Sequence, residues 1–354
     1  MKPRELTQKL IEFNTVTGNL EEIERALEFI EECFDNSFSI YRFEEEGVKS
    51  LLITSGGLED IRIILHGHLD VVEADKELFE PEIKNGKIYG RGSADMKSGL
   101  ACIMNIVKQQ ENEALGILIT SDEEKGGFNG TGHVIEETEI RPKLVISAEP
   151  DDSRIFPSIV NKQKGVLQLR ASVEGKSSHA SKPEKGENAI EKLMNIYAQD
   201  IRPLFDHHKE FSTTVNIGKI VGGESVNKVP NAAELHLDIR YSAQYPKEEV
   251  LEDLESIQAL NIEVTAQAPM MSTSQDEEIL KNLNNSICQV CGKKGGFRSE
   301  AFASDMRFFT SRDIPAVCFG PEGYNLHGQD EYVEVESLET YCEILKNFLQ
   351  SELT

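Results

Sequence analysis

The sequence predicts an α/β protein into which a smaller α+β domain is inserted. Two observations support this prediction. In the first and last parts of the chain, short apolar runs that end in polar clusters alternate with helical patterns. Between residues 165 and 272 this alternation gives way to a different order of strands and helices. The length of 354 residues also favours two domains. We therefore expect a discontinuous larger domain of residues 1–164 and 273–354 and an inserted domain of residues 165–272.

The larger domain is expected to alternate helices with buried strands. Apolar residues recur at helical spacing in 4–16, 19–34 and 96–110. Short apolar runs, which are typical of strands covered on both faces, occupy 50–55, 61–68, 115–124 and 143–150. The same alternation is predicted at the end of the chain, with a helix at 274–291, a strand at 314–320 and a helix at 337–350.

The inserted domain is expected to contain four strands and two helices. Their order along the chain is a strand at 165–175, a helix at 187–205, strands at 212–223 and 232–242, a helix at 247–260 and a strand at 261–268. The order β-α-β-β-α-β is the ferredoxin-like pattern, which forms a complete small domain.

The composition disfavours nucleic-acid and membrane partners. Lys and Arg together number 37 against 62 for Asp and Glu, so the net charge is −25, and such a surface repels nucleic acid and anionic membranes. The start of the chain lacks the apolar core of a signal peptide, and we find no apolar run long enough for a membrane span. Six scattered cysteines are typical of reduced thiols. We expect a cytoplasmic protein without nucleic-acid or membrane partners.

Acidic and imidazole side chains gather in a few strand-end or loop segments. The strand at 61–68 ends in His66, His68 and Asp70, which point to the same side because strands alternate their faces. Similar segments are GRGSADMKSG (90–99), TSDEEKGG (120–127), ISAEP (146–150) and NLHGQDEY (325–332). Carboxylates massed at the carboxyl edge of a sheet repel one another unless a divalent cation lies between them. Imidazole and carboxylate ligands without thiolates suit Zn²⁺, with Co²⁺ or Mn²⁺ as alternatives.

Two features of these segments favour a metal hydrolase. Asp95 lies between glycines at a strand-to-helix turn, where the main chain can approach a metal closely. Glu123 and Glu124 are adjacent, so in a tight turn one can bind the ion while the other acts as a base for metal-bound water.

Six segments, taken in order, resemble the signatures of one family. They are GHLDVV (67–72), GRGSADMKSGLA (90–101), TSDEEKGG (120–127), SAEP (147–150), GKSSHAS (175–181) and GPEGYNLHGQDEY (320–332). The family is that of the dinuclear zinc aminoacylases and carboxypeptidases, which includes acetylornithine deacetylase, succinyl-diaminopimelate desuccinylase and glutamate carboxypeptidase. The resemblance covers nearly the whole chain. It implies a mixed-sheet zinc-peptidase catalytic domain with an inserted dimerisation domain.

The resemblance also implies a ligand set for two zinc ions per subunit. His68 and Glu149 would bind one ion, Glu124 and His327 would bind the other, and Asp95 would bridge both.

Further roles follow from the same resemblance. Asp70 would accept a hydrogen bond from His68 and fix its tautomer. Glu123 would be the general base that takes a proton from the bridging water and later delivers it to the leaving amine. His179 would stabilise the oxyanion in the partner subunit of a homodimer, while Arg240 and Asn227 would hold the carboxylate and the amide of the substrate.

Other polar residues have simpler interpretations. His66 is expected to pack within its strand or to support the site, and Asp122 and Asp330 are expected to cap turns. We expect structural or surface roles for His133, His236, His207 and His208. For Arg240, an ion pair across the strands of the inserted domain is an equally good interpretation.

The sequence therefore predicts a metal-dependent hydrolase that cleaves the amide bond of a small substrate with a free carboxylate. An N-acyl amino acid deacylase is favoured, in the manner of the acetylornithine and succinyl-diaminopimelate enzymes. The alternative within the family is an exopeptidase that cleaves a dipeptide or a C-terminal residue. A non-catalytic binding protein is disfavoured, because the ligand set and the base are complete.

Overall fold

The chain folds into two compact units. A computed structural model describes residues 1–110, 112–205 and 211–353. Unit 1 comprises residues 1–162, 271–299 and 304–354, and unit 2 comprises residues 163–270 and 300–303. The sequence placed the boundaries after residues 164 and 272, and did not assign the short segment 300–303 to the inserted domain. His207 and His208 lie outside the described residues.

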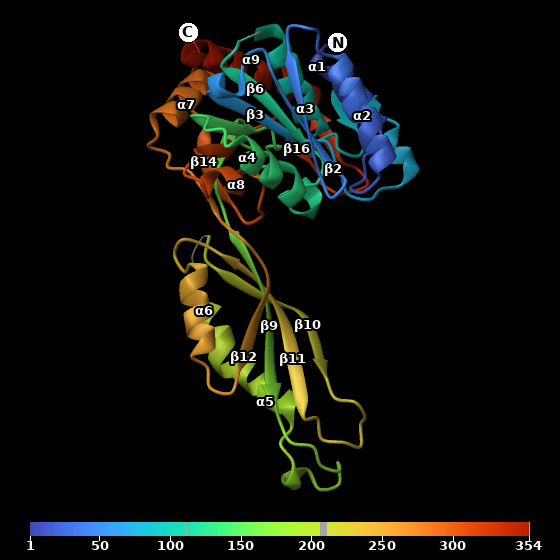
Figure 1. Cartoon of the computed structure of the whole chain (residues 1–354), viewed down its shortest axis with the longest axis vertical. Coiled ribbons are helices and arrows are strands. Elements are labelled where there is room, and N and C mark those ends of the chain that lie inside the picture. Colours follow the sequence, from blue (N-terminus) through green and yellow to red (C-terminus); the bar gives the residue numbers. More distant parts are fainter. Residues whose placement is uncertain (111, 206–210, 354) are drawn as a thin grey trace. The chain divides into compact units, whose positions relative to one another are not determined.

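Unit 1 is built on a mixed sheet (Figure 1). Its strands lie in the order β1 (Ser39–Glu45), β2 (Val48–Thr54), β6 (Leu115–Thr120), β3 (Ile63–His68), β7 (Leu144–Ser147), β15 (Ala316–Cys318), β8 (Ser158–Gln163) and β13 (Met271–Ser272), and β14 (Gly296–Glu300) pairs with β8. Strand β3 runs parallel to β6 and β7, and β7 runs parallel to β15. Strands β1 and β2 add an antiparallel edge. The predicted α/β class is confirmed.

Helices cover both faces of this sheet. One face carries α1 (Pro3–Ile11), α2 (Leu20–Glu32), α3 (Lys97–Gln110), α7 (Glu278–Cys291) and α9 (Val335–Leu353), and the other carries α4 (His133–Thr138) and α8 (Met306–Thr310). In β3, Ile63 and Leu65 pack into the apolar core under α1, α2, α3, α7 and α9. Ile64 packs into the core on the other face, under α4 and α8. Burial on both faces explains why this strand reads as an uninterrupted apolar run.

Several strands were not predicted, namely β1, the buried strand β8, the short strands β13 and β14, and a second sheet of short strands. Strand β1 is largely exposed and charged, so it lacks the apolar pattern of a buried strand. It joins β2 through Glu46 (φ 48°) and Gly47 (φ 82°), a turn that needs positive φ at both positions. A second sheet has the order β16 (Gly323–Tyr324), β17 (Tyr332–Glu334), β5 (Lys87–Tyr89) and β4 (Glu82–Lys84). Its pairing brings the segments before Asp95 and around His327 side by side.

Unit 2 has the predicted order of elements. These are β9 (Gly165–Glu174), α5 (Ala189–Ile196), β10 (Thr214–Gly222), β11 (Ala232–Tyr241), α6 (Lys247–Glu255) and β12 (Asn261–Ala268). The strands form an antiparallel sheet in the order β10-β11-β9-β12 (Figure 1). Alternate residues of β11 pack with both helices, and the intervening residues face away from that core. Strand β10 lies at the edge of the sheet.

Among the residues that the structure describes, every helix is too short or too polar to cross a membrane.

Close packing of α3 supports the edge of the sheet where β7 ends. A Cβ atom placed on Gly99, in the first turn of α3, would lie 2.1 Å from the main-chain oxygen of Ala148. Helix α3 therefore approaches the segment before Glu149 more closely than any side chain permits.

We predict that Gly99→Ala lowers the free energy of unfolding by about 1–3 kcal/mol, because the added methyl group forces α3 away from the sheet. Denaturant unfolding would measure this change. The matched control is Gln109→Ala on the exposed side of the same helix, which should stay within about 0.5 kcal/mol of the wild type. Wild-type stability for Gly99→Ala would contradict the close approach of α3.

Candidate metal centre

Three parallel strands of unit 1 deliver polar side chains to one edge of the sheet. Strand β3 ends at His68, and β6 and β7 are followed by Glu124 and Glu149. The carboxyl ends of parallel strands meet at the same edge, which is where open α/β sheets bind ligands. Asp95, two residues before the start of α3, and His327, between β16 and β17, complete the cluster.

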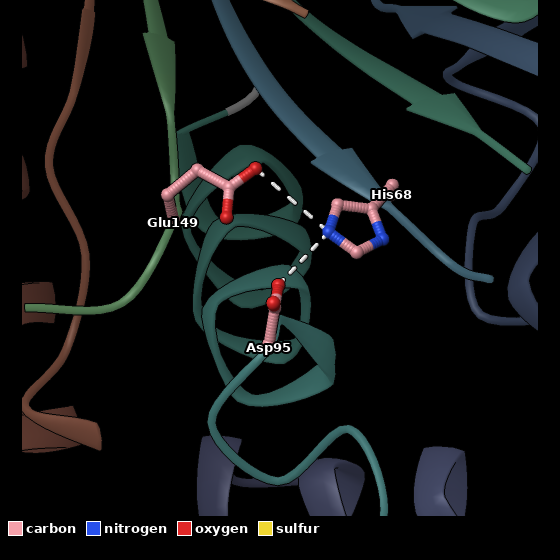
Figure 2. Close-up of side chains that lie close together, drawn as sticks. All are labelled: His68, Asp95 and Glu149. Atoms are coloured by element: carbon pink, nitrogen blue, oxygen red, sulfur yellow. Dashed lines mark hydrogen bonds and ion pairs between the residues drawn. The ribbon is translucent and has the colours of Figure 1, made fainter. Parts of the chain in front are cut away.

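One group of possible ligands consists of His68, Asp95 and Glu149. Figure 2 shows the imidazole of His68 facing both carboxylates. Its Nε2 lies 3.1 Å from Asp95 Oδ1 and 3.8 Å from Glu149 Oε1. One atom from each residue lies within 4.8 Å of the others, and the His68 side chain is fully buried.

A second group consists of Asp95, Glu124 and His327. Here His327 Nε2 lies 3.4 Å from Asp95 Oδ2 and 3.2 Å from Glu124 Oε1. These atoms also lie within 4.8 Å of one another. The two oxygens of Asp95 therefore face different imidazoles, and Asp95 belongs to both groups.

The charges in these groups fit divalent cations. Burial, together with repulsion from Asp95, raises the pKa of Glu149 to about 8. The carboxylates of Asp95 and Glu124 raise the pKa of His327 to about 10. The buried oxygens Glu124 Oε1 and Glu149 Oε1 face the imidazoles of His327 and His68, at 3.2 and 3.8 Å. Imidazoles and crowded, buried carboxylates together form a donor set for Zn²⁺ or a similar ion.

His68 is oriented by the main chain. Its Nδ1 lies 2.9 Å from the main-chain oxygen of Asp70, while the Asp70 carboxylate lies 3.5 Å away. A proton on Nδ1 donated to this carbonyl leaves Nε2 free to bind an ion. The Asp70 carboxylate instead accepts hydrogen bonds from the main-chain N–H groups of Glu123 and Glu124 and from the hydroxyl of Thr17.

Glu123 lies beside the ligands without joining either group. It begins the short 3₁₀ turn Glu123–Lys125, in which adjacent side chains diverge. Burial raises the pKa of Glu123 well above its ordinary value, His68 opposes that change, and Glu149 and Asp305 reinforce it. A carboxyl group with a raised pKa next to a ligand set is suited to proton transfer.

A buried polar network supports the turn that carries Glu123 and Glu124. The carboxylate of Asp122 accepts hydrogen bonds from the N–H groups of Asn129 and Gly130, so it ties the turn to the following segment Phe128–Gly132 instead of capping the turn itself. Thr131 donates to Asp305 Oδ2 at 2.6 Å. His66 lies 3.0 Å from Ser147 Oγ, 3.2 Å from Thr131 Oγ1 and 3.5 Å from Asp305, which fits the predicted supporting role.

In unit 2 the structure brings two of the three predicted residues together. The segments of His179 and Asn227 are paired, since the N–H of Ala180 donates to the main-chain oxygen of Asn227 at 3.0 Å. His179 is exposed, and its Nδ1 accepts a hydrogen bond from the N–H of Ser181 at 3.2 Å. In the neutral ring the proton therefore resides on Nε2, which can donate to a ligand.

Arg240 lies elsewhere in unit 2. Strand β11 begins at Ala232, shortly after Asn227, whereas Arg240 is near the end of the strand. At about 3.4 Å per residue, Arg240 lies roughly 27 Å from Ala232. Its guanidinium binds Asp238 of the same strand through two nitrogens, at 2.7 and 3.3 Å. The structure thus shows an ion pair within the sheet, along one strand rather than across two.

Sequence reasoning missed several residues that hold the ligands. Arg91 and Glu331 form a buried ion pair beside Asp95, and Asp305 supports the turn after β6. None of them stands out by its local sequence pattern, and only its long-range contacts distinguish it from a solvated side chain.

Comparison with known proteins is consistent with this geometry. The model of peptidase family M20/M25/M40 matches residues 64–351. Succinyl-diaminopimelate desuccinylase from Sulfurovum sp. (strain NBC37-1) is 30% identical over 370 residues, with 98% of both chains covered. The enzyme of that name from Nautilia profundicola is 28% identical, also with 98% of both chains covered.

Solved structures share the fold over the full length. A tripeptidase from Staphylococcus aureus has a TM-score of 0.79 at 23% identity, covering 99% of this chain and 97% of its own. An M20 family metallo-carboxypeptidase from Sulfolobus solfataricus has a TM-score of 0.74 at 17% identity, covering 99% of both chains.

These findings confirm the resemblance that the motifs predicted. They show that the protein is a metal-dependent hydrolase of amide bonds. The chain belongs to the peptidase family M20/M25/M40.

Proposed function

We propose that this hydrolase is an N-acyl amino acid deacylase, and that N-succinyl-diaminopimelate is its substrate. The observation that carries the proposal is the pair of ligand groups that share Asp95 beside Glu123. The choice of acyl amino acid is supported by full-length similarity to proteins named succinyl-diaminopimelate desuccinylase. The two similar structures described above are peptidases, but at 23% and 17% identity they support the fold alone.

We propose two Zn²⁺ ions per subunit. His68 and Glu149 would hold one ion, Glu124 and His327 would hold the other, and Asp95 would bind both. Ions held there supply Lewis acidity toward the scissile carbonyl and toward water. Zinc is favoured because the donors are imidazoles and carboxylates without a thiolate.

The proton transfers are assigned to Glu123. Its carboxylate would accept the proton of the attacking water and later give that proton to the leaving amine. The raised pKa of Glu123 suits both steps, because the group has to hold the proton between them. The Asp70 carboxylate accepts hydrogen bonds from the N–H groups of Glu123 and Glu124. It would thereby fix the main chain of this turn, so that the Glu124 side chain points to the metal ion and the Glu123 side chain points to the attacking water.

We propose that the protein acts as a homodimer in the cytoplasm. The edge strand β10 leaves Ile217, Ile220 and Val221 partly exposed, which suits pairing with a second copy. His179, with Nε2 available as a donor, would stabilise the oxyanion in the partner's active site. Asn227 would bind the substrate amide, and Arg240 would bind its carboxylate after exchanging Asp238 for it.

A substrate panel tests the proposed reaction. We predict that the zinc-loaded protein hydrolyses N-succinyl-diaminopimelate with a higher kcat/KM than N-acetylornithine, N-acetyllysine, an N-acylglutamate, dipeptides or tripeptides. Chelation with EDTA should abolish turnover, and added Zn²⁺ or Co²⁺ should restore it. Faster hydrolysis of a peptide would establish an exopeptidase instead. A zinc-loaded protein that cleaves none of these compounds would contradict the proposal.

Glu123→Gln separates the base from the ligands. This change removes the proton acceptor and leaves both ligand groups intact, so we expect kcat to fall by about 10²–10⁴-fold at unchanged zinc content. The matched control is Glu124→Gln in the same turn, which should lose zinc as well as activity. Elemental analysis and steady-state kinetics would measure both. If Glu123→Gln loses zinc, the residue is a ligand rather than the base.

Mixed dimers test the role of His179. We expect His179→Ala and Glu123→Gln to be inactive when each is purified alone. Dimers that contain one copy of each should regain about half of the wild-type kcat, because one of the two sites in a symmetric dimer then has every group. Co-expression with two different tags provides these dimers, and light scattering checks their mass. Inactive mixed dimers would place His179 in its own subunit's site, and a monomeric wild type would exclude the shared site.

A further inference from the structure

A buried carboxylate lies behind the shared ligand Asp95. Glu331, directly before β17, is 1% exposed. Its Oε1 accepts hydrogen bonds from the main-chain N–H groups of Ala94 at 2.9 Å and Asp95 at 3.1 Å. Its Oε2 accepts one from the N–H of Gly92 at 3.1 Å and another from Arg91 Nη1. Glu331 thus holds the whole turn that presents Asp95.

Arg91 extends this network to the second imidazole. Its side chain is also buried, with Nη1 on Glu331 and Nη2 donating to the main-chain oxygen of His327 at 3.0 Å. The main chain of His327 has a φ of 64°, and that of Asn325 has a φ of 59°. Non-glycine residues rarely adopt such values, so this loop depends on its surroundings to keep its shape. Arg91 supplies one of those contacts.

Stability alone is a poor explanation for this pair. Removing two charges from water costs free energy, and well-packed apolar residues often stabilise a protein as well or better. The pair does something that apolar residues cannot do. It gives directed hydrogen bonds to two segments that are far apart in the sequence, and each segment carries a ligand.

We propose that Arg91 and Glu331 are positioning residues that fix Asp95 and His327 relative to each other, so that both ligand groups exist at the same time. This inference rests on the proposed metal-dependent function. Neither residue belongs to a ligand group, and both act through the main chain of the ligand segments. Glu331 binds the main chain of Asp95, which belongs to both ligand groups. Arg91 binds the main chain of His327, which belongs to one group.

This difference sets the expected results. Glu331→Gln replaces one acceptor oxygen with an amide nitrogen that faces N–H donors, so we expect the affinity for both metal ions to fall by about 10–100-fold. Arg91→Lys keeps a cation beside Glu331 but has only one nitrogen, which cannot reach both Glu331 and the main-chain oxygen of His327. We therefore expect only one of the two ions to bind more weakly, by about 10-fold.

Cobalt titration of the full-length protein measures these changes. The visible absorption of bound Co²⁺ reports each binding step, and elemental analysis after dialysis reports the stoichiometry. Glu334→Gln is the matched control, because Glu334 pairs with Lys87 at 3.2 Å between the same two strands, β17 and β5, but is partly exposed and holds no ligand segment. It should bind two ions with wild-type affinity. Circular dichroism of the metal-free variants checks that they fold.

The inference would be overturned if the Glu331→Gln and Arg91→Lys variants fold and bind both ions with wild-type affinity. A lower melting temperature of these variants would not change that conclusion. If Glu331→Gln fails to fold, Arg91→Lys decides alone: weaker binding of one ion supports the inference, and two wild-type steps overturn it. A wild-type protein that binds no Co²⁺ would overturn the proposed function and this inference with it. Normal wild-type binding with unaffected variants would overturn the inference alone.

Discussion

Repulsion among carboxylates is the constraint on which the structure of this site depends. Asp95, Glu124 and Glu149 converge where β3, β6 and β7 end, and their ion-pair partners are His68 and His327. Burial and the neighbouring carboxylates raise the pKa of Glu149 to about 8, because both disfavour another negative charge in the site. A divalent cation bound to the same oxygens would remove this repulsion.

The protein orients the ligands mainly with uncharged main-chain groups. The carbonyl of Asp70 sets the ring of His68, and N–H groups of residues 92, 94 and 95 converge on Glu331. The nearby buried cations have other partners. Arg91 pairs with Glu331, and Lys97 donates to the carbonyl of Phe13, while burial lowers the pKa of Lys97 to about 7. The oxygens of the proposed ligands therefore do not pair with these two buried cations.

In unit 2, Arg240 shows that a residue type suited to substrate binding can also be suited to a structural ion pair. An arginine suits a substrate carboxylate, but the same guanidinium also suits a neighbouring aspartate, and residues two apart on a strand share a face. In the structure Asp238 satisfies Arg240 through two hydrogen bonds. A substrate carboxylate has to compete with this pair, so Arg240 can recognise substrate only if binding provides more than the exchange of one carboxylate for another.

The sequence predicted those parts of the site that depend on local pattern. The apolar run of β3 ending in His68 and the adjacent acids after β6 follow from strand periodicity and from position at a strand end. Glu331 could not be found in this way. It is one acid among the polar residues 325–332, and its burial results from β17 pairing with β5, which are strands of three residues each. Because short strands leave almost no periodic signal, the contact between Glu331 and residues 92–95 is a product of tertiary structure alone. Local sequence pattern thus identifies groups that could bind an ion, whereas the residues that orient those groups are identified only by contacts between distant segments.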